Sequence, residues 1–193
     1  MKNMFIIHGY QAHTDSHWFE WLATQMKSYD YHTEIVYLPN TNNPNLKAWD
    51  KAIQNSLKNK LDQDTIIVAH SLGVISVLNY LSKEDVFTNI KGLFLISGFS
   101  EPLDNLPELN HFINQTKVEF ENINAQHIVT IGGDNDPVVD INATHRLSHL
   151  LNTETVSLHH DGHFQDSDGY FTFEFLKNQI TTILSNKDSE IGI

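Results

Sequence analysis

Residues 65–81 join an apolar strand pattern directly to a helix pattern that is apolar on nearly every side. Residues 65–69 (TIIVA) are mostly β-branched, which favours a strand. Residues 72–81 (LGVISVLNYL) have no polar face, and a helix of this kind is stable only where other elements cover it. A buried strand followed at once by a buried helix predicts a sheet with helices packed against it.

The same alternation of short apolar runs and longer periodic segments continues through the chain. Strand patterns occur at residues 5–7, 34–38, 65–69, 93–96, 128–131 and 155–158. Helix patterns occur at residues 18–26, 46–57, 72–81, 143–151 and 170–184. This order predicts an α/β fold, a three-layer sandwich whose mostly parallel sheet of about six strands carries helices on both faces. Residues 99–121, with weak periodicity, are expected to form an excursion over the top of the sheet.

The length of 193 residues is typical of one domain, because a single hydrophobic core can serve a chain of this size. Apolar residues make up 40% of the chain and charged residues 19%, which is an ordinary globular composition. We therefore expect one domain at residues 1–185, followed by a polar tail at residues 186–193.

The chain carries 24 acidic residues against 12 lysines and arginines, which gives a formal net charge of -12. A negative surface repels nucleic-acid phosphates and anionic lipids, so neither nucleic acid nor a membrane is an expected partner. The same charge disfavours strongly anionic substrates. Small molecules remain the expected partners, and no protein partner can be assigned.

The sequence contains no cysteine, which excludes disulfides, thiolate catalysis and cysteine zinc sites. The apolar run near the N-terminus covers only residues 5–7, which is too short for the core of a signal peptide. No other segment has the length and hydrophobicity expected of a membrane span. The expected location is therefore the cytoplasm.

Residues 69–73 (AHSLG) lie at the junction between the buried strand and the buried helix. The segment matches the G-x-S-x-G nucleophile elbow, with Ala69 in the first position. A sharp strand-to-helix turn brings the residues two before and two after the serine together, and only small residues such as Ala69 and Gly73 fit there. The turn lifts the Ser71 hydroxyl above the sheet, beside the amides that begin a helix. Ser71 is therefore a candidate nucleophile, and the alternative is that it only caps the helix.

A serine hydroxyl is a weak nucleophile at neutral pH and needs a base within reach. In folds with this elbow, the acid follows a late strand and the histidine follows the last one. Residues 159–164 (HHDGHF) follow the last predicted strand. His163 is favoured as the base, because Gly162 lets the loop bend toward the nucleophile. His159 and His160 lie nearer the strand end and are expected to be structural or exposed.

Residues 132–137 (GGDNDP) follow the preceding predicted strand and can supply the acid. Asp136 precedes a proline, which favours an extended or turn conformation that can aim the carboxylate. Asp134 and Asp140 remain alternatives on position alone. The acid would hold the imidazole in one tautomer and stabilise its protonated form.

The intermediate of acyl transfer carries an oxyanion that needs two N–H donors. The residue after the nucleophile normally gives one, which here is the Leu72 amide. The second is expected from the loop after the first strand, His8-Gly9-Tyr10, and we assign it to the Tyr10 amide. This chemistry needs no cofactor. No His-Glu-x-x-His motif is present, and no metal site is expected.

These segments together resemble a family of small serine hydrolases that includes retinoblastoma-binding protein 9 and bacterial esterases. The resemblance covers nearly the whole chain and rests on His8-Gly9-Tyr10 and on residues 17–22 (HWFEWL), 69–73 (AHSLG), 95–98 (LISG), 136–139 (DPVV) and 162–164 (GHF). It implies a compact α/β-hydrolase fold with little or no lid and a Ser-Asp-His triad. Carried over residue by residue, the triad falls on Ser71, Asp136 and His163, which favours Asp136 over Asp134.

The sequence therefore predicts a carboxylesterase-like serine hydrolase that acts on small acyl substrates through an acyl-enzyme. Residues 10–17 and 99–121 are expected to form the walls of its pocket. The alternative is a non-catalytic protein-binding module on an α/β-hydrolase scaffold, because a fold does not by itself specify a function. Reaction of Ser71 with a fluorophosphonate probe would discriminate between the two hypotheses.

Overall fold

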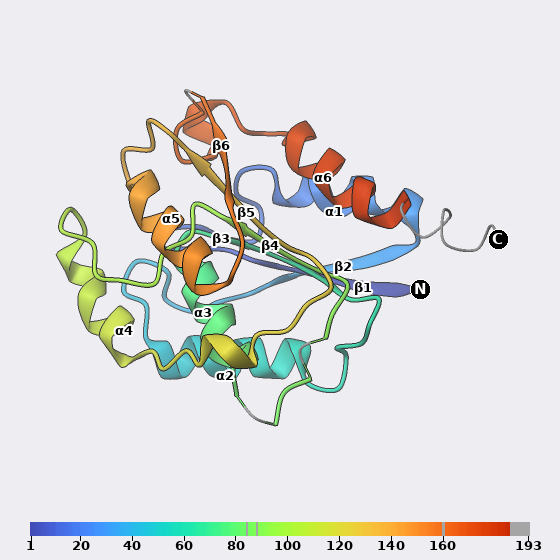
Figure 1. Ribbon diagram of the computed structural model, residues 1–193, viewed down its shortest axis with the longest axis horizontal. Coiled ribbons are helices and arrows are strands. Elements are labelled where there is room, and N and C mark those ends of the chain that lie inside the picture. Colours follow the sequence, from blue (N-terminus) through green and yellow to red (C-terminus); the bar gives the residue numbers. More distant parts are fainter. Residues whose placement is uncertain (84, 88, 160, 186–193) are drawn as a thin grey trace.

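The computed structural model describes residues 1–83, 85–87, 89–159 and 161–185 (Figure 1). Its centre is a six-stranded sheet in which every neighbouring pair of strands is parallel, with helices on both faces. This confirms the predicted three-layer α/β sandwich. The polar tail predicted at residues 186–193 lies outside the described residues. In the described ranges, no helix has both the length and the hydrophobicity needed to cross a membrane.

The order of the strands across the sheet marks the place where a ligand is expected. The strands are β1 (Lys2–Ile7), β2 (Tyr31–Val36), β3 (Ile66–His70), β4 (Gly92–Ile96), β5 (Ile128–Gly133) and β6 (Thr155–Leu158). Their order is β2-β1-β3-β4-β5-β6, so the chain places β2 on one side of β1 and then crosses back to place β3 on the other. In open α/β sheets, ligands bind beyond the carboxyl ends of the strands at such a reversal, which here lies between β1 and β3.

The helices form two layers, each with its own hydrophobic core. They are α1 (Phe19–Met26), α2 (Leu46–Leu57), α3 (Leu72–Leu81), α4 (Asn110–Gln115), α5 (Ile141–Leu150) and α6 (Glu174–Ser185). On one face of the sheet, α1 and α6 share a core that includes Phe19, Leu22 and Ile180 (Figure 1). On the other face, α2, α3 and α5 share a second core, to which α4 adds Phe112. We call these the α1/α6 layer and the α2/α3/α5 layer.

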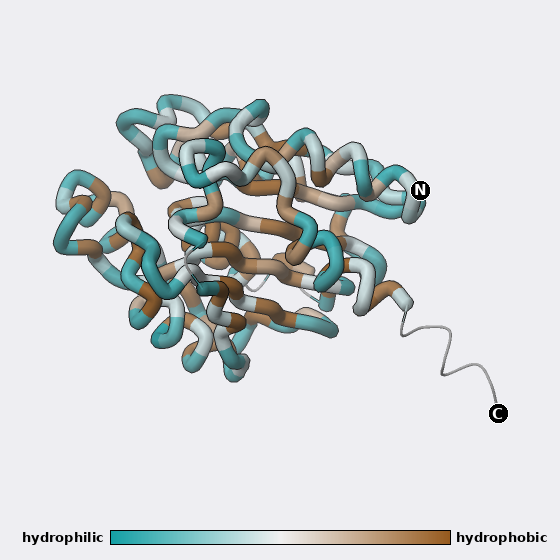
Figure 2. The backbone as a smooth tube through the Cα atoms, turned by 90° about the horizontal axis from the view of Figure 1, so that it is seen from above, coloured by the Kyte–Doolittle hydropathy of each residue, from teal (hydrophilic) through white to brown (hydrophobic). Residues whose placement is uncertain are grey.

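The segment at residues 65–81 occupies the centre of the molecule, as its pattern predicts. Every residue of β3 and of β4 is buried, because each of these strands has a neighbour on both sides and a helix layer on both faces. Every residue of α3 is buried as well. Figure 2 shows the apolar stretches running through the middle of the fold. The elbow at residues 69–73 is therefore held by fully packed elements on both of its sides.

The last helix begins at Glu174 rather than at residue 170. Tyr170 and Phe173 carry apolar rings at helical spacing, but both rings pack on Phe164 in the loop after β6, at centroid distances of 5.1 and 5.0 Å. These contacts hold the chain in an irregular conformation, and the helix starts only after them.

The second strand and the excursion also differ from the sequence prediction. β2 covers Tyr31–Val36 rather than residues 34–38, because it pairs along its whole length with β1, from Lys2 opposite Tyr31 to Ile7 opposite Val36. The excursion at residues 99–121 contains the short helix α4, although its sequence has only weak periodicity. Phe112 and Ile113 are the two buried side chains of that helix, and a helix of six residues is too short to produce a periodic pattern.

Candidate active site

Ser71 lies in the sharp turn between β3 and α3 with a backbone conformation that is unusual for a residue other than glycine. Its φ is 55° and its ψ is -125°, and the backbone N–H of Ser71 donates to the carbonyl of Ile96 at 2.9 Å. Residues in such conformations persist only where the surrounding structure fixes them, and they are concentrated at functional sites. The requirement for a small residue two positions later is explained by sterics. A Cβ atom on Gly73 would lie 2.4 Å from the carbonyl oxygen of His8.

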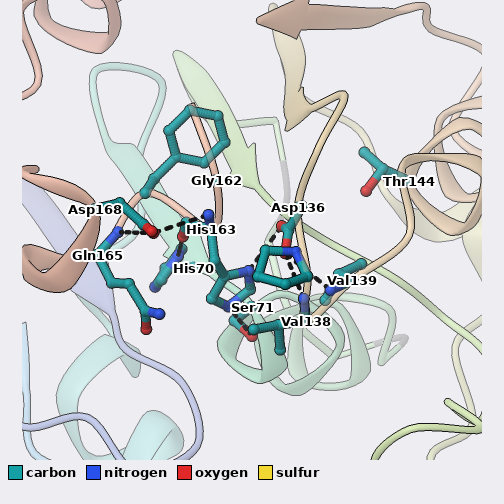
Figure 3. A network of polar contacts seen from close by, with 12 residues as sticks. His70, Ser71, Asp136, Val138, Val139, Thr144, Gly162, His163, Gln165 and Asp168 are labelled. Atoms are coloured by element: carbon teal, nitrogen blue, oxygen red, sulfur yellow. Dashed lines mark hydrogen bonds and ion pairs between the residues drawn. The ribbon is translucent and has the colours of Figure 1, made fainter. Parts of the chain in front are cut away.

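The structure brings the three predicted triad residues into one line (Figure 3). Nε2 of His163 lies 3.0 Å from Oγ of Ser71, and Nδ1 of His163 lies 2.8 Å from Oδ2 of Asp136. The other carboxylate oxygen of Asp136 accepts hydrogen bonds from the amides of Val138 and Val139, at 2.8 and 3.0 Å. Because those two bonds fix Oδ1, the orientation of Oδ2 toward the imidazole is fixed as well. The side chains of Asp136 and His163 are 1% and 5% exposed, so water screens this pair little.

The alternative residues considered from the sequence lie in other contacts. Asp134 pairs with Nδ1 of His159 outside this line, and the His159 side chain is 75% exposed. Asp140 caps α5, where its side chain accepts a hydrogen bond from the amide of Asn142 at 2.8 Å. His160 lies outside the described residues. Position along the chain left these choices open, whereas the contacts separate Asp136 from both other aspartates.

The loop that carries His163 is strained at Phe164 and is held by hydrogen bonds to its backbone amides. Gly162 and Phe164, on either side of His163, have φ values of 61° and 55°. The amide of Gly162 donates to Oδ1 of Asn135 at 2.9 Å, and the amide of His163 donates to Oδ2 of Asp168 at 2.9 Å. These bonds offset the strain and fix the position of the imidazole.

Two buried aromatic side chains hold the carbonyls of the same loop. Nε2 of His70 lies 2.8 Å from the carbonyl oxygen of His163, and Nε1 of Trp18 lies 2.9 Å from that of Phe164. Since a carbonyl only accepts, His70 must carry its proton on Nε2. Sequence reasoning assigned no role to His70. The one sequence signal for a role of His70 was its position inside the elbow motif. That position does not reveal that the side chain contacts the backbone of His163.

The loop after β1 lies directly against the elbow, where the second oxyanion donor is expected. A Cβ atom on Gly9 would lie 3.0 Å from Cβ of Ser71 and 3.3 Å from the amide nitrogen of Leu72. Only glycine leaves the space in front of that nitrogen open. Tyr10, the next residue, lines the same cavity as Ser71. The backbone of Gly9 and the Leu72 amide are therefore neighbours.

A cavity of about 360 Å³ opens in front of Ser71 and His163. Both segments expected to form its walls contribute to the lining: residues 10–12, 16 and 17 from the first, and Phe99, Leu106 and Leu109 from the second. A larger hollow of about 720 Å³ lies along α1 and β2, but it contains neither Ser71 nor His163. Among the described residues, no group of three or more histidine, aspartate or glutamate side chains is placed to hold a metal ion.

Burial lowers the pKa of three histidines around the site. The pKa of His70 lies well below its usual value, mainly because the ring is fully buried, and the neighbouring His163 and His17 lower it further. Burial is also the largest cause of the lowered pKa values of His8 and His17. The neutral forms of these rings are therefore favoured in the folded chain.

We expect the free energy of unfolding to fall as the pH falls below about 6.5. A histidine whose pKa is depressed by folding stabilises the fold fully above its unfolded pKa, and this contribution is lost as the pH falls, because the unfolded chain binds more protons. For a fully buried ring such as His70 the slope approaches about 1.4 kcal/mol per pH unit. Urea unfolding at several pH values between 7.5 and 5.5 measures this slope of the free energy of unfolding against pH. His70→Gln should flatten the slope and His149→Gln, at an exposed position, should not; equal slopes in all three proteins would contradict this account.

Comparison with known proteins identifies a family for the chain and agrees with the fold. A family model described as serine hydrolase matches residues 4–182. The chain is 28% identical to the protein YdeN of Bacillus subtilis (strain 168) over 188 residues, which cover 96% of this chain and 98% of YdeN. It is 25% identical to the serine hydrolase RBBP9 of Rattus norvegicus over 125 residues, which cover 64% of this chain and 65% of that protein.

Solved structures show the same fold. The crystal structure of the ydeN gene product of B. subtilis matches with a TM-score of 0.89 at 27% identity, covering 96% of this chain and 100% of that chain. Est1E of Butyrivibrio proteoclasticus, in a structure with bound ferulic acid, matches with a TM-score of 0.62 at 18% identity, covering 94% of this chain and 90% of that chain. The fold is that of the α/β hydrolases.

Proposed function

This chain belongs to the serine hydrolase family, and on that basis we propose that it hydrolyses small carboxylic esters through an acyl-enzyme on Ser71. His163 acts as general base and acid, and Asp136 orients it. The amides of Leu72 and Tyr10 stabilise the oxyanion. The observation that carries this proposal is the unbroken line of contacts from Ser71 Oγ through His163 to Asp136, at 3.0 and 2.8 Å.

In the first half of the reaction, Nε2 of His163 takes the proton of Ser71 as Oγ attacks the ester carbonyl. The new Oγ–C bond makes a tetrahedral intermediate, whose negative oxygen accepts hydrogen bonds from the Leu72 and Tyr10 amides. The bond from carbon to the alcohol oxygen then breaks. The proton on His163 passes to that oxygen, and the alcohol leaves.

In the second half, water takes the place of the alcohol. His163 removes a proton from the water as its oxygen attacks the acyl carbon, and a second tetrahedral intermediate forms. The Oγ–C bond breaks, Ser71 recovers its proton from His163, and the carboxylic acid is released. Throughout, Asp136 holds the Nδ1–H tautomer and stabilises the imidazolium.

Turnover of p-nitrophenyl acetate and p-nitrophenyl butyrate tests this proposal directly. We expect the purified chain to release p-nitrophenol at a rate that is proportional to enzyme concentration and that fluorophosphonate pretreatment eliminates. The alternative, a protein-binding module on the same scaffold, predicts a folded chain that neither turns over the esters nor reacts with the probe. That result would replace the hydrolase proposal with the binding one.

A further inference from the structure

The cavity in front of Ser71 has two walls of different chemistry, which come from opposite layers of the fold. One wall contains Phe99, Leu106 and Leu109, which pack in the core of the α2/α3/α5 layer. The other wall contains His17, Gln165 and Asp166. The first wall offers only hydrocarbon surface, whereas the second offers hydrogen-bonding groups and one carboxylate.

The polar wall belongs to the side of the α1/α6 layer. The ring of His17 contacts Phe19 of α1 at a centroid distance of 5.3 Å. Gln165 and Asp166 directly follow Phe164, which is part of the core of the same layer. The carboxyl edge of the sheet, with Ser71 on it, therefore runs between the two walls.

The route of the proton decides which part of an ester meets which wall. His163 lies on the side of the α1/α6 layer, because its ring is 4.8 Å from that of His70, and His70 in turn contacts Phe19 at 6.1 Å. The base must give its proton to the departing alcohol oxygen, so the alcohol lies on the side of His163. The alcohol then meets the polar wall, and the acyl group faces the hydrocarbon wall.

The groups on the polar wall are suited to a neutral or cationic alcohol. The amide of Asp166 donates to Nδ1 of His17 at 3.1 Å, so the proton of the neutral His17 ring is on Nε2, where it can donate. Among the described residues that line the cavity, Asp166 is the one acidic side chain, and none is a lysine or an arginine. Oδ1 of Asp166 accepts a hydrogen bond from the Ser167 amide at 2.8 Å and lies 3.5 Å from Nδ1 of His17, and the side chain is 50% exposed. An ammonium group on the alcohol would therefore lie near one half-exposed carboxylate, whereas an anionic alcohol would have no cation near it.

We propose that this cavity takes esters of a short, apolar acyl group with a polar alcohol that is uncharged or cationic. The volume of about 360 Å³ lies near the small end of the range for ligand pockets, which limits the length of the acyl chain. This inference rests on the proposed function and adds the substrate class to it.

Two butyrate esters of the same shape test the polar wall. Choline butyrate and 3,3-dimethylbutyl butyrate differ in one positive charge, and their hydrolysis can be followed by acid release in a pH-stat. We expect kcat/KM to be about threefold higher for the choline ester, the size of an attraction between partly exposed charges. Asp166→Asn should lower the ratio about threefold, to the value that the intrinsic reactivities of the two esters set. Glu119→Gln removes an exposed carboxylate outside the cavity and should leave the ratio as it is.

A wild-type ratio at or below one would overturn the assignment of the polar wall. Equal effects of Asp166→Asn and Glu119→Gln would overturn it too, because they would attribute the preference to the net charge of -12 rather than to the cavity.

The hydrocarbon wall is tested by acyl length. From acetate to butyrate, kcat/KM should rise about fourfold per methylene buried. Leu106→Ala should lower the ratio of kcat/KM for the butyrate ester to kcat/KM for the acetate ester. This reduction should be equal for p-nitrophenyl esters and for choline esters, since the acyl group is common to both. A change for only one alcohol, or a changed acyl ratio in Asp166→Asn, would contradict the wall assignment. Labelling of Ser71 and turnover of p-nitrophenyl butyrate in the wild type test the proposed function separately.

Discussion

Replacing Ser71 with alanine is expected to lower kcat for p-nitrophenyl butyrate by roughly 10⁵-fold, to the level that substrate binding and the oxyanion donors alone provide. The loss is large because no acyl-enzyme can form without Oγ. His163→Ala should cost about as much, since the two residues act as one unit. Asp136→Asn should lower kcat by about 10⁴-fold, because an amide nitrogen in place of Oδ2 favours the wrong tautomer of His163. Steady-state kinetics on the purified variants measure all three effects.

Ser82→Ala is the matched control for this series. Ser82 is also a buried serine, but it lies just past the opposite end of α3, where its Oγ donates to the carbonyls of Asn79 and Lys117. Its removal should leave kcat nearly unchanged. If Ser71→Ala retained more than about a tenth of the wild-type kcat, which corresponds to an increase of less than about 1.4 kcal/mol in the activation free energy, the nucleophile would have to be another residue.

Replacing Gly73 with alanine is expected to give the largest loss of stability for one added methyl group. The new Cβ would lie 2.4 Å from the carbonyl oxygen of His8 and 2.6 Å from that of Ile7. Both atoms belong to the backbone at the end of β1, which is paired on both sides and cannot retreat as a side chain could. We expect the free energy of unfolding to fall by about 3 kcal/mol and the Tm by about 6 to 12 °C.

Gly132→Ala controls for the loss of a glycine as such. A Cβ atom at this position would meet Ile141, Thr144 and Thr155 at 3.4 to 3.6 Å, which is ordinary van der Waals contact. In thermal unfolding, the Tm of this variant should therefore be close to that of the wild type. A Gly73→Ala protein as stable as Gly132→Ala would show that the junction of β1 and α3 is looser than these distances imply.

Strands and helices with a strong hydrophobic pattern could be predicted from the sequence, because the pattern records which side chains are buried. The pattern at residues 72–81 gave the bounds of α3 as the structure has them, and that at residues 46–57 gave those of α2. Weaker patterns placed boundaries less well. Tyr170 and Phe173 have the spacing of a helix but pack on Phe164, and spacing carries no information on which partner an aromatic ring meets.

That Ser71, Asp136 and His163 lie close together could be predicted from the sequence, because each lies in the connection that follows a strand of a parallel sheet. Strands of this kind end at one edge, so residues distant in the chain meet there. The hydrogen bonds that hold His163 could not be predicted in this way. His70 and Trp18 reach the loop through contacts between side chain and backbone at sequence separations of 93 and 146 residues, and Asp168 does so from five residues further along the same loop.

The most direct measurement of the central claim is the site of covalent attachment of a fluorophosphonate probe. The probe phosphorus should form one bond to Oγ of Ser71, and tandem mass spectrometry of the digested protein should place a single adduct on the peptide that contains Ser71. His163→Ala, although folded, should label far more slowly, because the base no longer takes the serine proton. An adduct on another residue, or none on a folded wild-type chain, would contradict the account.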